Sequence, residues 1–371
     1  MSPTTEQELA EAVAAAPGAL RIIGGGTTDI GKPVTGQALS VAGLSGITLY
    51  EPGALTLVAR AGTPLAEIEA AAAAENQRLA FEPMDYRRLL GTSGEPTIGG
   101  VVAANISGPR RVQVGAARDH LLGVRFVDGR GAAIKNGGRV MKNVTGYDLV
   151  KLMAGSWGTL GVLSEVAFKV LPRTDVTASV LIKGLSDTDA VRAMSMALGS
   201  PFEVSGAAHD PAGPVSMLRI EGFENSVAYR ARELQRLLGW AGDISVENDP
   251  DAVAARWSGV RDAAAFADRP GDVWRISVKP SDGPAIVARC AADAVLYDWG
   301  GGLIWVLVAE GTDLRARIGA FGGHATLVRA TRATRAALPV FQPEPAPLAA
   351  ISAGLRAKFD PRGILNPGLM G

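Results

Sequence analysis

Residues 142–172 contain three glycines that interrupt what would otherwise be one helix, and this stretch constrains the fold more than any other. The segment reads KNVTGYDLVKLMAGSWGTLGVLSEVAFKVLP. A turn leads into a short amphipathic run, Gly155, Gly158 and Gly161 then break the helical period, and an alternating strand pattern follows. Glycines this close together indicate a backbone that approaches another group closely or takes positive φ, or alternatively a set of tight turns.

Two earlier stretches are also rich in glycine. A predicted strand at residues 20–23 runs directly into GGGTTD at residues 24–29. Backbone N–H groups and hydroxyls in such a loop suit a pyrophosphate, with a plain turn as the alternative, and the pattern is neither G-x-G-x-x-G nor a Walker loop. The stretch TIGGVVAANISG at residues 97–108 combines paired glycines with polar Asn105 and Ser107. We expect it to form a second loop for the same anion.

Length and composition limit the classes of protein to consider. A chain of 371 residues predicts two domains. The 37 basic and 37 acidic side chains cancel, so we expect neither a nucleic acid partner nor an anionic membrane surface. The single cysteine, Cys290, excludes an internal disulfide. An acidic N-terminus and the lack of a long apolar window predict a cytoplasmic protein with no membrane span, which reaches the inner membrane only through partners.

The order of the expected elements predicts an α+β fold. Strands and one capped helix, residues 65–74, fill the first half. From about residue 174, strands and helices alternate in a way typical of a second α+β domain with an antiparallel sheet. In it we expect a helix at 226–238 with Arg230, Arg232 and Arg236 facing solvent, a helix at 249–265, and a hairpin turn at the glycine triplet 300–302. The predicted domains are 1–174, 175–340, and a linker and tail at 341–371 that dock back on the first domain.

The order of four motifs points to a known family. GGGTTD, TIGGVVAANISGPRR, KNVTGYDLVKLMAGSWGTLGV and, near the C-terminus, KFDPRGILNPG follow one another along the chain. This arrangement resembles the FAD-binding flavoproteins of the vanillyl-alcohol oxidase (PCMH) type over the whole chain. Within that family, the short length, the Gly108-Pro109-Arg110-Arg111 run and the strand at 274–277 make it most similar to the FAD-binding subunits of bacterial glycolate oxidases.

The resemblance implies a PCMH-type domain of two α+β subdomains that hold FAD, and a smaller α+β cap domain with an antiparallel sheet. It places the glycine loops at the phosphates and nearby flavin atoms, residues 158–162 along the adenosine, and Asn143, Tyr147 and the tail nearer the isoalloxazine. The implied FAD-binding residues are Gly24, Gly25, Gly26, Thr27, Thr28, Asp29, Thr97, Gly99, Gly100, Asn105, Ser107, Gly108, Asn143, Tyr147, Gly158, Gly161, Val162 and Asn366.

The sequence departs from its relatives at three points. Family members that attach flavin covalently use His or Cys, and the glycine loops contain neither, so we predict non-covalent FAD. Close relatives that oxidise 2-hydroxy acids carry a His-x-His metal site, whereas the three histidines of this chain, His120, His209 and His324, are far apart in sequence. We therefore predict no metal site. Trp157 stands where many relatives have Glu.

Oxidation of glycolate or a similar 2-hydroxy acid needs a cation for the carboxylate and a base for the hydroxyl proton. Arg275 and His324 are the candidate catalytic residues, with a surface ion pair and a structural histidine as the alternatives. The resemblance also implies partners, namely a larger homologous flavin subunit and an iron–sulfur subunit that receives electrons. Two other functions stay open: a flavin subunit that only relays electrons or supports assembly, and a flavin-independent scaffold.

Overall fold

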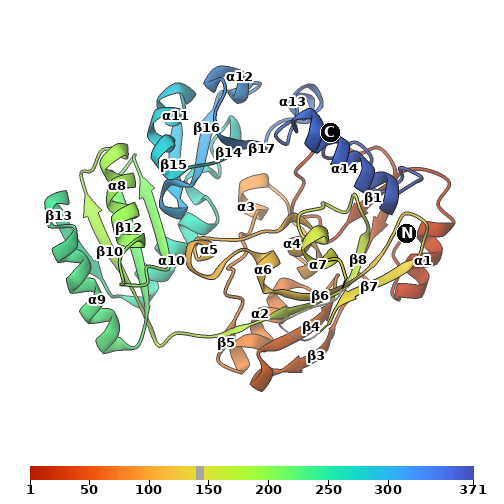
Figure 1. Cartoon of the computed structure of the whole chain (residues 1–371), viewed down its shortest axis with the longest axis horizontal. Coiled ribbons are helices and arrows are strands. Elements are labelled where there is room, and N and C mark those ends of the chain that lie inside the picture. Colours follow the sequence, from red (N-terminus) through yellow and green to blue (C-terminus); the bar gives the residue numbers. More distant parts are fainter. Residues whose placement is uncertain (139–145) are drawn as a thin grey trace. The chain divides into compact units, whose positions relative to one another are not determined.

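The computed structural model describes residues 1–138 and 146–371, and the chain divides into two compact units. Unit 1 comprises residues 1–107, 115–173 and 343–371, and unit 2 comprises residues 108–114 and 174–342. The chain thus leaves unit 1 after Ser107, contributes a short segment to unit 2 and returns at Gly115. Figure 1 shows both units as mixtures of helices and strands, so the fold is α+β, as predicted.

Unit 1 contains a five-stranded antiparallel sheet. Its order is β3 (Ile47–Glu51), β4 (Thr56–Arg60), β8 (Val162–Lys169), β6 (Leu121–Val127) and β7 (Ala133–Gly137). β6 and β7 form a hairpin that turns at Asp128 and Gly129. Two small sheets accompany it, a parallel pair of β1 (Leu20–Ile23) with β2 (Gln37–Ser40) and an antiparallel pair of β5 (Gln77–Arg78) with β9 (Leu171–Pro172).

The helices of unit 1 are short, apart from the last one. They are α1 (Glu6–Ala14), α2 (Leu65–Ala74), α3 (Arg87–Leu90), α4 (Ile98–Ala104), α6 (Ala117–His120), α7 (Leu149–Met153) and α14 (Ala346–Phe359), with a 3-10 turn η1 (Pro52–Ala54). Thr5 caps α1 by accepting a hydrogen bond from the Glu8 backbone, which explains why the helix begins there.

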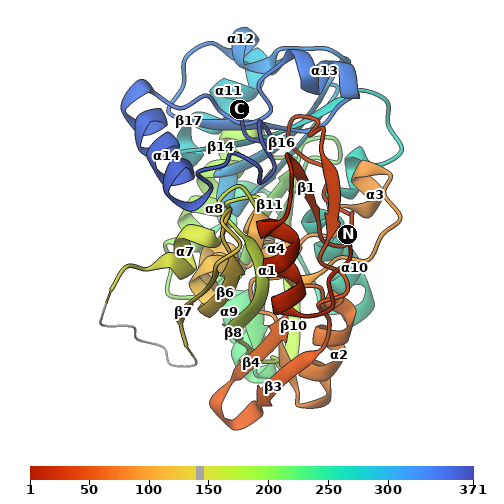
Figure 2. The same cartoon turned by 90° about the vertical axis from the view of Figure 1, so that its right-hand side faces the viewer.

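The C-terminal tail is part of the core of unit 1. Ile364 and Leu365 are buried with Leu9 of α1, Leu20 of β1 and Leu39 of β2. The backbone of β1 donates a hydrogen bond from Leu20 to the Ile364 carbonyl at 2.7 Å. In Figures 1 and 2 the tail that follows α14 runs beside β1. The tail therefore borders the space at the C-terminal end of β1.

Unit 2 is built on one eight-stranded antiparallel sheet, in which neighbouring strands pair in the order β13-β10-β12-β11-β15-β16-β14-β17. In chain order these strands are β10 (Val176–Lys183), β11 (Gly206–Asp210), β12 (Val215–Gly222), β13 (Asp243–Glu247), β14 (Asp272–Val278), β15 (Ala294–Asp298), β16 (Leu303–Val308) and β17 (Gly323–Arg329). The sequence predicted an antiparallel sheet in the second α+β half of the chain, and this prediction is confirmed.

The helical segments of unit 2 connect these strands. They are α5 (Arg111–Val114), α8 (Asp187–Leu198), α9 (Glu224–Leu237), α10 (Pro250–Arg261), α11 (Gly283–Cys290), α12 (Leu314–Ile318) and α13 (Arg332–Ala337), with 3-10 turns η2 (Gly239–Ala241), η3 (Ala264–Phe266), η4 (Pro280–Asp282) and η5 (Trp299–Gly301). Ser186 caps α8 by accepting from the Asp189 backbone. The hairpin at the glycine triplet is confirmed, since β15 and β16 pair across η5.

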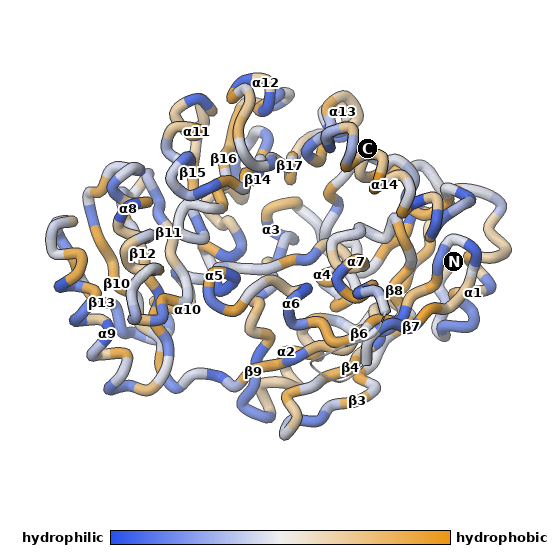
Figure 3. Tube along the Cα trace, in the orientation of Figure 1, coloured by the Kyte–Doolittle hydropathy of each residue, from blue (hydrophilic) through white to orange (hydrophobic). Residues whose placement is uncertain are grey.

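Two expectations in this unit are wrong. Arg230 of α9 was expected to face solvent, but it is buried and donates to the Glu221 carbonyl at 2.6 Å. Figure 3 shows α9 as a largely hydrophilic helix, so its composition alone does not reveal this contact. The helix predicted at 249–265 ends at Arg261, because Ala263 takes a left-handed conformation with φ of 49° and a 3-10 turn follows.

The longest helices that the structure describes, α9 and α14, each have 14 residues. No helix in the described ranges combines the length and apolarity that crossing a bilayer requires.

Candidate functional site: a glycine-lined cavity and a cationic cluster

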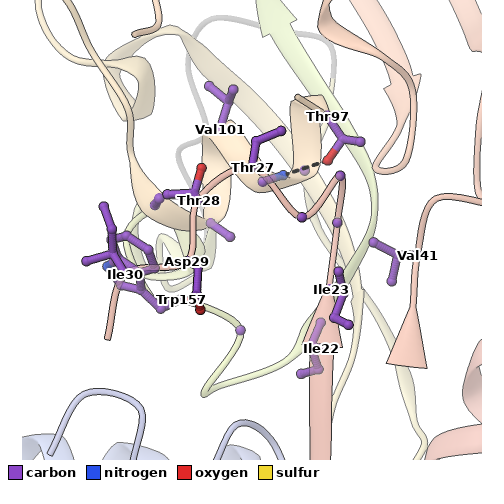
Figure 4. Close-up of a pocket in the computed structure, with 18 of the residues that line it drawn as sticks. Ile22, Ile23, Thr27, Thr28, Asp29, Ile30, Val41, Thr97, Val101 and Trp157 are labelled. Carbon is purple, nitrogen blue, oxygen red and sulfur yellow. Dashed lines mark hydrogen bonds between the residues drawn. The ribbon is translucent and has the colours of Figure 1, made fainter. Parts of the chain in front are cut away.

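Unit 1 contains a cavity of about 410 Å³ at the end of β1. This volume lies within the range of roughly 300–1,000 Å³ that is usual for small-molecule and cofactor sites. Three predicted segments line it together with the tail, as Figure 4 shows for the loop around Thr27 and Thr28, for Thr97 before α4, and for Trp157. The predicted residues that line the cavity are Gly24, Gly25, Gly26, Thr27, Thr28, Asp29, Thr97, Gly99, Gly100, Gly158, Gly161, Val162 and Asn366.

The loop after β1 can form only because two glycines face each other. A Cβ on Gly25 would lie 1.5 Å from the Glu95 carbonyl oxygen, and one on Gly94 would lie 1.7 Å from the Gly25 oxygen. Any side chain at either position would therefore overlap the opposite backbone. The Thr92 hydroxyl fixes the crossing by donating to the Thr27 carbonyl at 3.1 Å.

The same loop offers hydrogen-bond donors that the chain does not use. Within the described ranges, the backbone N–H groups of Gly25, Gly26, Thr27 and Thr28 donate to no protein acceptor. Adjacent N–H groups of this kind form an anion-binding concavity. The loop therefore fits the phosphates of a dinucleotide, with the hydroxyls of Thr27 and Thr28 beside them.

The second glycine stretch has a different role. The backbones of Ile98 and Gly99 donate to the carbonyls of Thr63 and Ala61, and Gly100 donates to the Thr97 hydroxyl. A Cβ on Gly99 would lie 2.7 Å from that of Ala61. These glycines allow α4 to pack closely against the chain after β4, and the first N–H groups of the helix are already bonded.

The third stretch is fastened by the tail. The Asn366 side chain accepts from the Ile22 backbone at 2.8 Å and donates to the Trp157 carbonyl at 2.9 Å. Trp157 itself has φ of 53°, and its backbone donates to the Ala103 carbonyl. The amide of Asn366 thus joins β1 to the loop at 157, and the residue shapes the cavity through these contacts.

Among the described residues, four predicted FAD-binding residues do not line this cavity. The side chains of Asn105 and Ser107 accept from the backbones of Arg118 and Ala117, which ties the end of α4 to α6. Gly108 belongs to unit 2. Tyr147 is 88% exposed. Asn143 lies outside the described residues.

The two predicted catalytic residues lie in unit 2, on neighbouring strands. In the antiparallel register, Ser277 of β14 is opposite His324 of β17, and Arg275 is opposite Thr326. Paired residues, and residues two apart on a strand, point to the same face. Arg275 and His324 therefore share one face of the sheet.

Two further residues join them, and the sequence analysis gave them no chemical role. The Arg275 guanidinium lies 5.2 Å from the centroid of the Trp299 ring, and the Arg111 guanidinium lies 4.6 Å from it. Partial desolvation together with the positive charges of Arg275 and Arg111 lowers the pKa of His324. This lowered pKa favours the neutral imidazole at pH 7. The only sequence signal was the Gly-Pro-Arg-Arg run, which supported the resemblance.

Among the residues that the structure describes, no group of three or more His, Cys, Asp or Glu side chains gathers in a way that could hold a metal ion. The one cysteine, Cys290, is buried, and burial raises the pKa of its thiol to about 11.

Comparisons with known proteins agree with this geometry. Residues 1–137 match the model of the FAD binding domain family. The glycolate oxidase subunit GlcE of Escherichia coli (strain K12) is 39% identical over 344 residues, which cover 92% of this chain and 89% of that protein. The glycolate oxidase subunit GlcD of Bacillus subtilis (strain 168) is 39% identical over 85 residues, 23% of this chain and 18% of that protein.

A solved structure supports the fold alone. Alkyldihydroxyacetonephosphate synthase matches 99% of this chain with a TM-score of 0.70 at 15% identity, over 76% of its own chain. At this identity the likeness extends to the architecture and not to the chemistry.

Proposed function

Because the chain belongs to the family of FAD-binding oxidoreductases that includes the glycolate oxidase subunit GlcE, we propose that it is the FAD-binding subunit of a glycolate oxidase complex. It takes part in the oxidation of glycolate or a similar 2-hydroxy acid to the 2-oxo acid, and electrons pass on through partner subunits. In this proposal residues 1–174 form the FAD-binding domain, with the tail 341–371 docked on it, and residues 175–340 form the cap domain.

The observation that carries the proposal is the loop at 24–29. It lines a cofactor-sized cavity, and its unused N–H donors suit a pyrophosphate. Glycine is required at Gly25 for the loop to cross its neighbour, and Asn366 holds the far wall. The glycine loops supply no His or Cys, so the cofactor is held without a covalent bond.

The reaction breaks two bonds of the substrate, Cα–H and O–H. FAD, when bound, accepts the hydride from Cα. We assign the other two tasks to unit 2: Arg275 binds the carboxylate, and a ring nitrogen of neutral His324 accepts the hydroxyl proton. The lowered pKa of His324 keeps this nitrogen available as a base at neutral pH.

The names of two relatives support the proposal of partner subunits. The relative that matches 92% of this chain is named a subunit, and a second glycolate oxidase subunit shares a segment of this sequence. We therefore propose a complex with a larger homologous flavin subunit and an iron–sulfur subunit. In this proposal the complex lies in the cytoplasm and reaches the inner membrane through those partners, which fractionation of cells that express the complex would check.

Anaerobic mixing of the FAD-loaded chain with glycolate tests this function. Bleaching of the flavin band in the isolated chain supports direct catalysis. If only the assembled complex is bleached, and Arg275→Met in this chain leaves turnover unchanged, the chain is instead an electron-relay or assembly subunit. If the chain neither binds FAD nor affects turnover of the complex, both flavin functions are contradicted. The flavin-independent scaffold is then the remaining function.

A further inference from the structure

Two guanidiniums of unit 2 contact one indole ring, and a histidine lies on the same sheet face as one of them. The guanidiniums of Arg111 and Arg275 lie 4.6 Å and 5.2 Å from the centroid of Trp299, and His324 shares a sheet face with Arg275. We call these four residues the Trp299 cluster. Arg275, Trp299 and Arg111 are half-buried, so their charges and ring are partly withdrawn from water without being sealed off.

The ring is held independently of the two arginines. Its indole N–H donates to the Gly108 carbonyl at 3.1 Å, and the Trp299 backbone donates to the Asp298 carboxylate at 2.7 Å. Trp299 has φ of 51°, a left-handed conformation that persists only where surrounding contacts over-determine it. These contacts set the orientation of the indole before any ligand arrives.

The segment that carries Arg111 is also anchored. Arg110 makes a two-pronged ion pair with Glu221 of β12, with both shortest N···O distances at 2.9 Å. The side chains of this pair are 15% and 4% exposed. Because Arg110 and the Gly108 carbonyl fix residues 108–114 to unit 2, the position of Arg111 beside the ring is a property of the fold.

Two guanidiniums lie beside the ring, while the Asp298 carboxylate accepts a hydrogen bond from the Trp299 backbone. Within the described ranges the Arg275 side chain makes no hydrogen bond or ion pair, and its guanidinium contacts the indole. A cation–π contact offsets part of the desolvation of a guanidinium but leaves its charge in place. The groups that perturb His324 electrostatically are both cationic, Arg275 and Arg111. An anion placed here would relieve this repulsion.

We propose that Arg111 acts together with Arg275 as a two-guanidinium clamp for the carboxylate of the 2-hydroxy acid, with Trp299 setting the spacing between them. The inference rests on the proposed function and adds Arg111 and Trp299 to the substrate site. A guanidinium is a planar fork that pairs with both oxygens of a carboxylate, and two such forks fix its plane as well as its position. When the carboxylate is fixed in this way, the neighbouring hydroxyl of the acid points toward the sheet face that carries His324.

Binding measured without turnover tests the clamp. Thermal unfolding of the FAD-loaded chain is followed with increasing glycolate and, separately, with glycolamide, its neutral isostere. A ligand that binds the folded state raises the melting temperature by an amount set by its Kd. We expect glycolate, and not glycolamide, to raise it, and Arg111→Met and Arg275→Met each to weaken glycolate binding by about 10- to 100-fold.

The chain supplies a matched control. Arg192 of the same unit stacks on Trp240 at the same 4.6 Å separation, so Arg192→Met removes a cation–π contact of the same length at another ring. We expect this variant to bind glycolate like the wild type. Arg111→Lys keeps the positive charge but loses the planar guanidinium. We expect its affinity for glycolate to lie between that of the wild type and that of Arg111→Met.

The results separate this inference from the proposed function. Wild-type affinity for glycolate in both Arg111→Met and Arg111→Lys overturns the clamp, as does equal binding of glycolate and glycolamide by the wild type. If glycolate binds and depends on Arg111, yet bleaches the flavin neither in the isolated chain nor in the complex, the clamp stands and the oxidative function fails.

Discussion

At Gly25, one hydrogen in place of a side chain decides whether the cavity loop can form. The residue lies where two backbones cross, and a Cβ there would be 1.5 Å from the Glu95 oxygen. Gly26 differs, because the space around its missing Cβ is open and its φ of 72° is the constraint. Neighbouring glycines in one motif are thus required for different reasons, one for close approach and one for conformation.

We expect Gly25→Ala to displace the loop and to abolish FAD binding. Overpacking against a backbone that has no free space costs about 1–3 kcal/mol of stability. Gly18→Ala is the matched control, since Gly18 precedes the same strand, takes no positive φ and has open space around it. Flavin absorbance per chain and the melting temperature measure both effects. Equal FAD content in the two variants would show that the loop does not hold the cofactor.

The sequence revealed individual residues unevenly. Runs of glycine and hydroxyl residues made the loop at 24–29 recognisable, because adjacent N–H donors are a local property. The roles of Gly99 and Gly100 could not be recognised from the sequence, because their N–H groups donate to the Ala61 carbonyl and the Thr97 hydroxyl only in the folded chain. Arg111 and Trp299 lie far apart in sequence, and only the folded chain brings them together.

Elements with local signals were predicted well. Residues 65–74 form α2 as expected. The short strand β11 has no alternation of apolar and polar residues, because four of its five residues are buried and both faces of the strand are therefore covered. Arg230 shows the limit of helical periodicity, which separates the faces of a helix but does not identify what covers them.

The buried Arg110–Glu221 ion pair is one of the contacts that hold residues 108–114 in unit 2, and we expect Arg110→Met to destabilise the protein. Removing one partner of a buried pair costs about 3–5 kcal/mol when the other charge is left uncompensated. Arg219 lies 3.9 Å from the Glu221 carboxylate and offsets part of this cost. Arg256 and Glu247 form a similar two-pronged pair at 31% and 21% side-chain exposure, so Arg256→Met should cost about 1 kcal/mol or less. Urea unfolding of both variants measures the difference. Equal losses would mean that burial of the Arg110–Glu221 pair contributes nothing.

At the scale of the whole molecule, the chain crosses between its units four times, around residues 107, 114, 173 and 342. The last two crossings coincide with changes in sequence character, whereas nothing local marks the first two. Through these crossings the motif at 97–111 contributes to both units: α4 borders the glycine-lined cavity, and Arg111 joins the Trp299 cluster. One continuous motif therefore contributes residues to both the proposed cofactor site and the proposed carboxylate site.

Titration of the flavin-free chain with FAD tests the central claim, that the glycine-lined cavity of unit 1 is a dissociable FAD site. We predict saturation at one FAD per chain, a rise in melting temperature that grows with free FAD, and complete release of the flavin into the supernatant when the protein is precipitated with acid. A melting temperature unchanged by FAD, or flavin that stays attached to the precipitated chain, would contradict it.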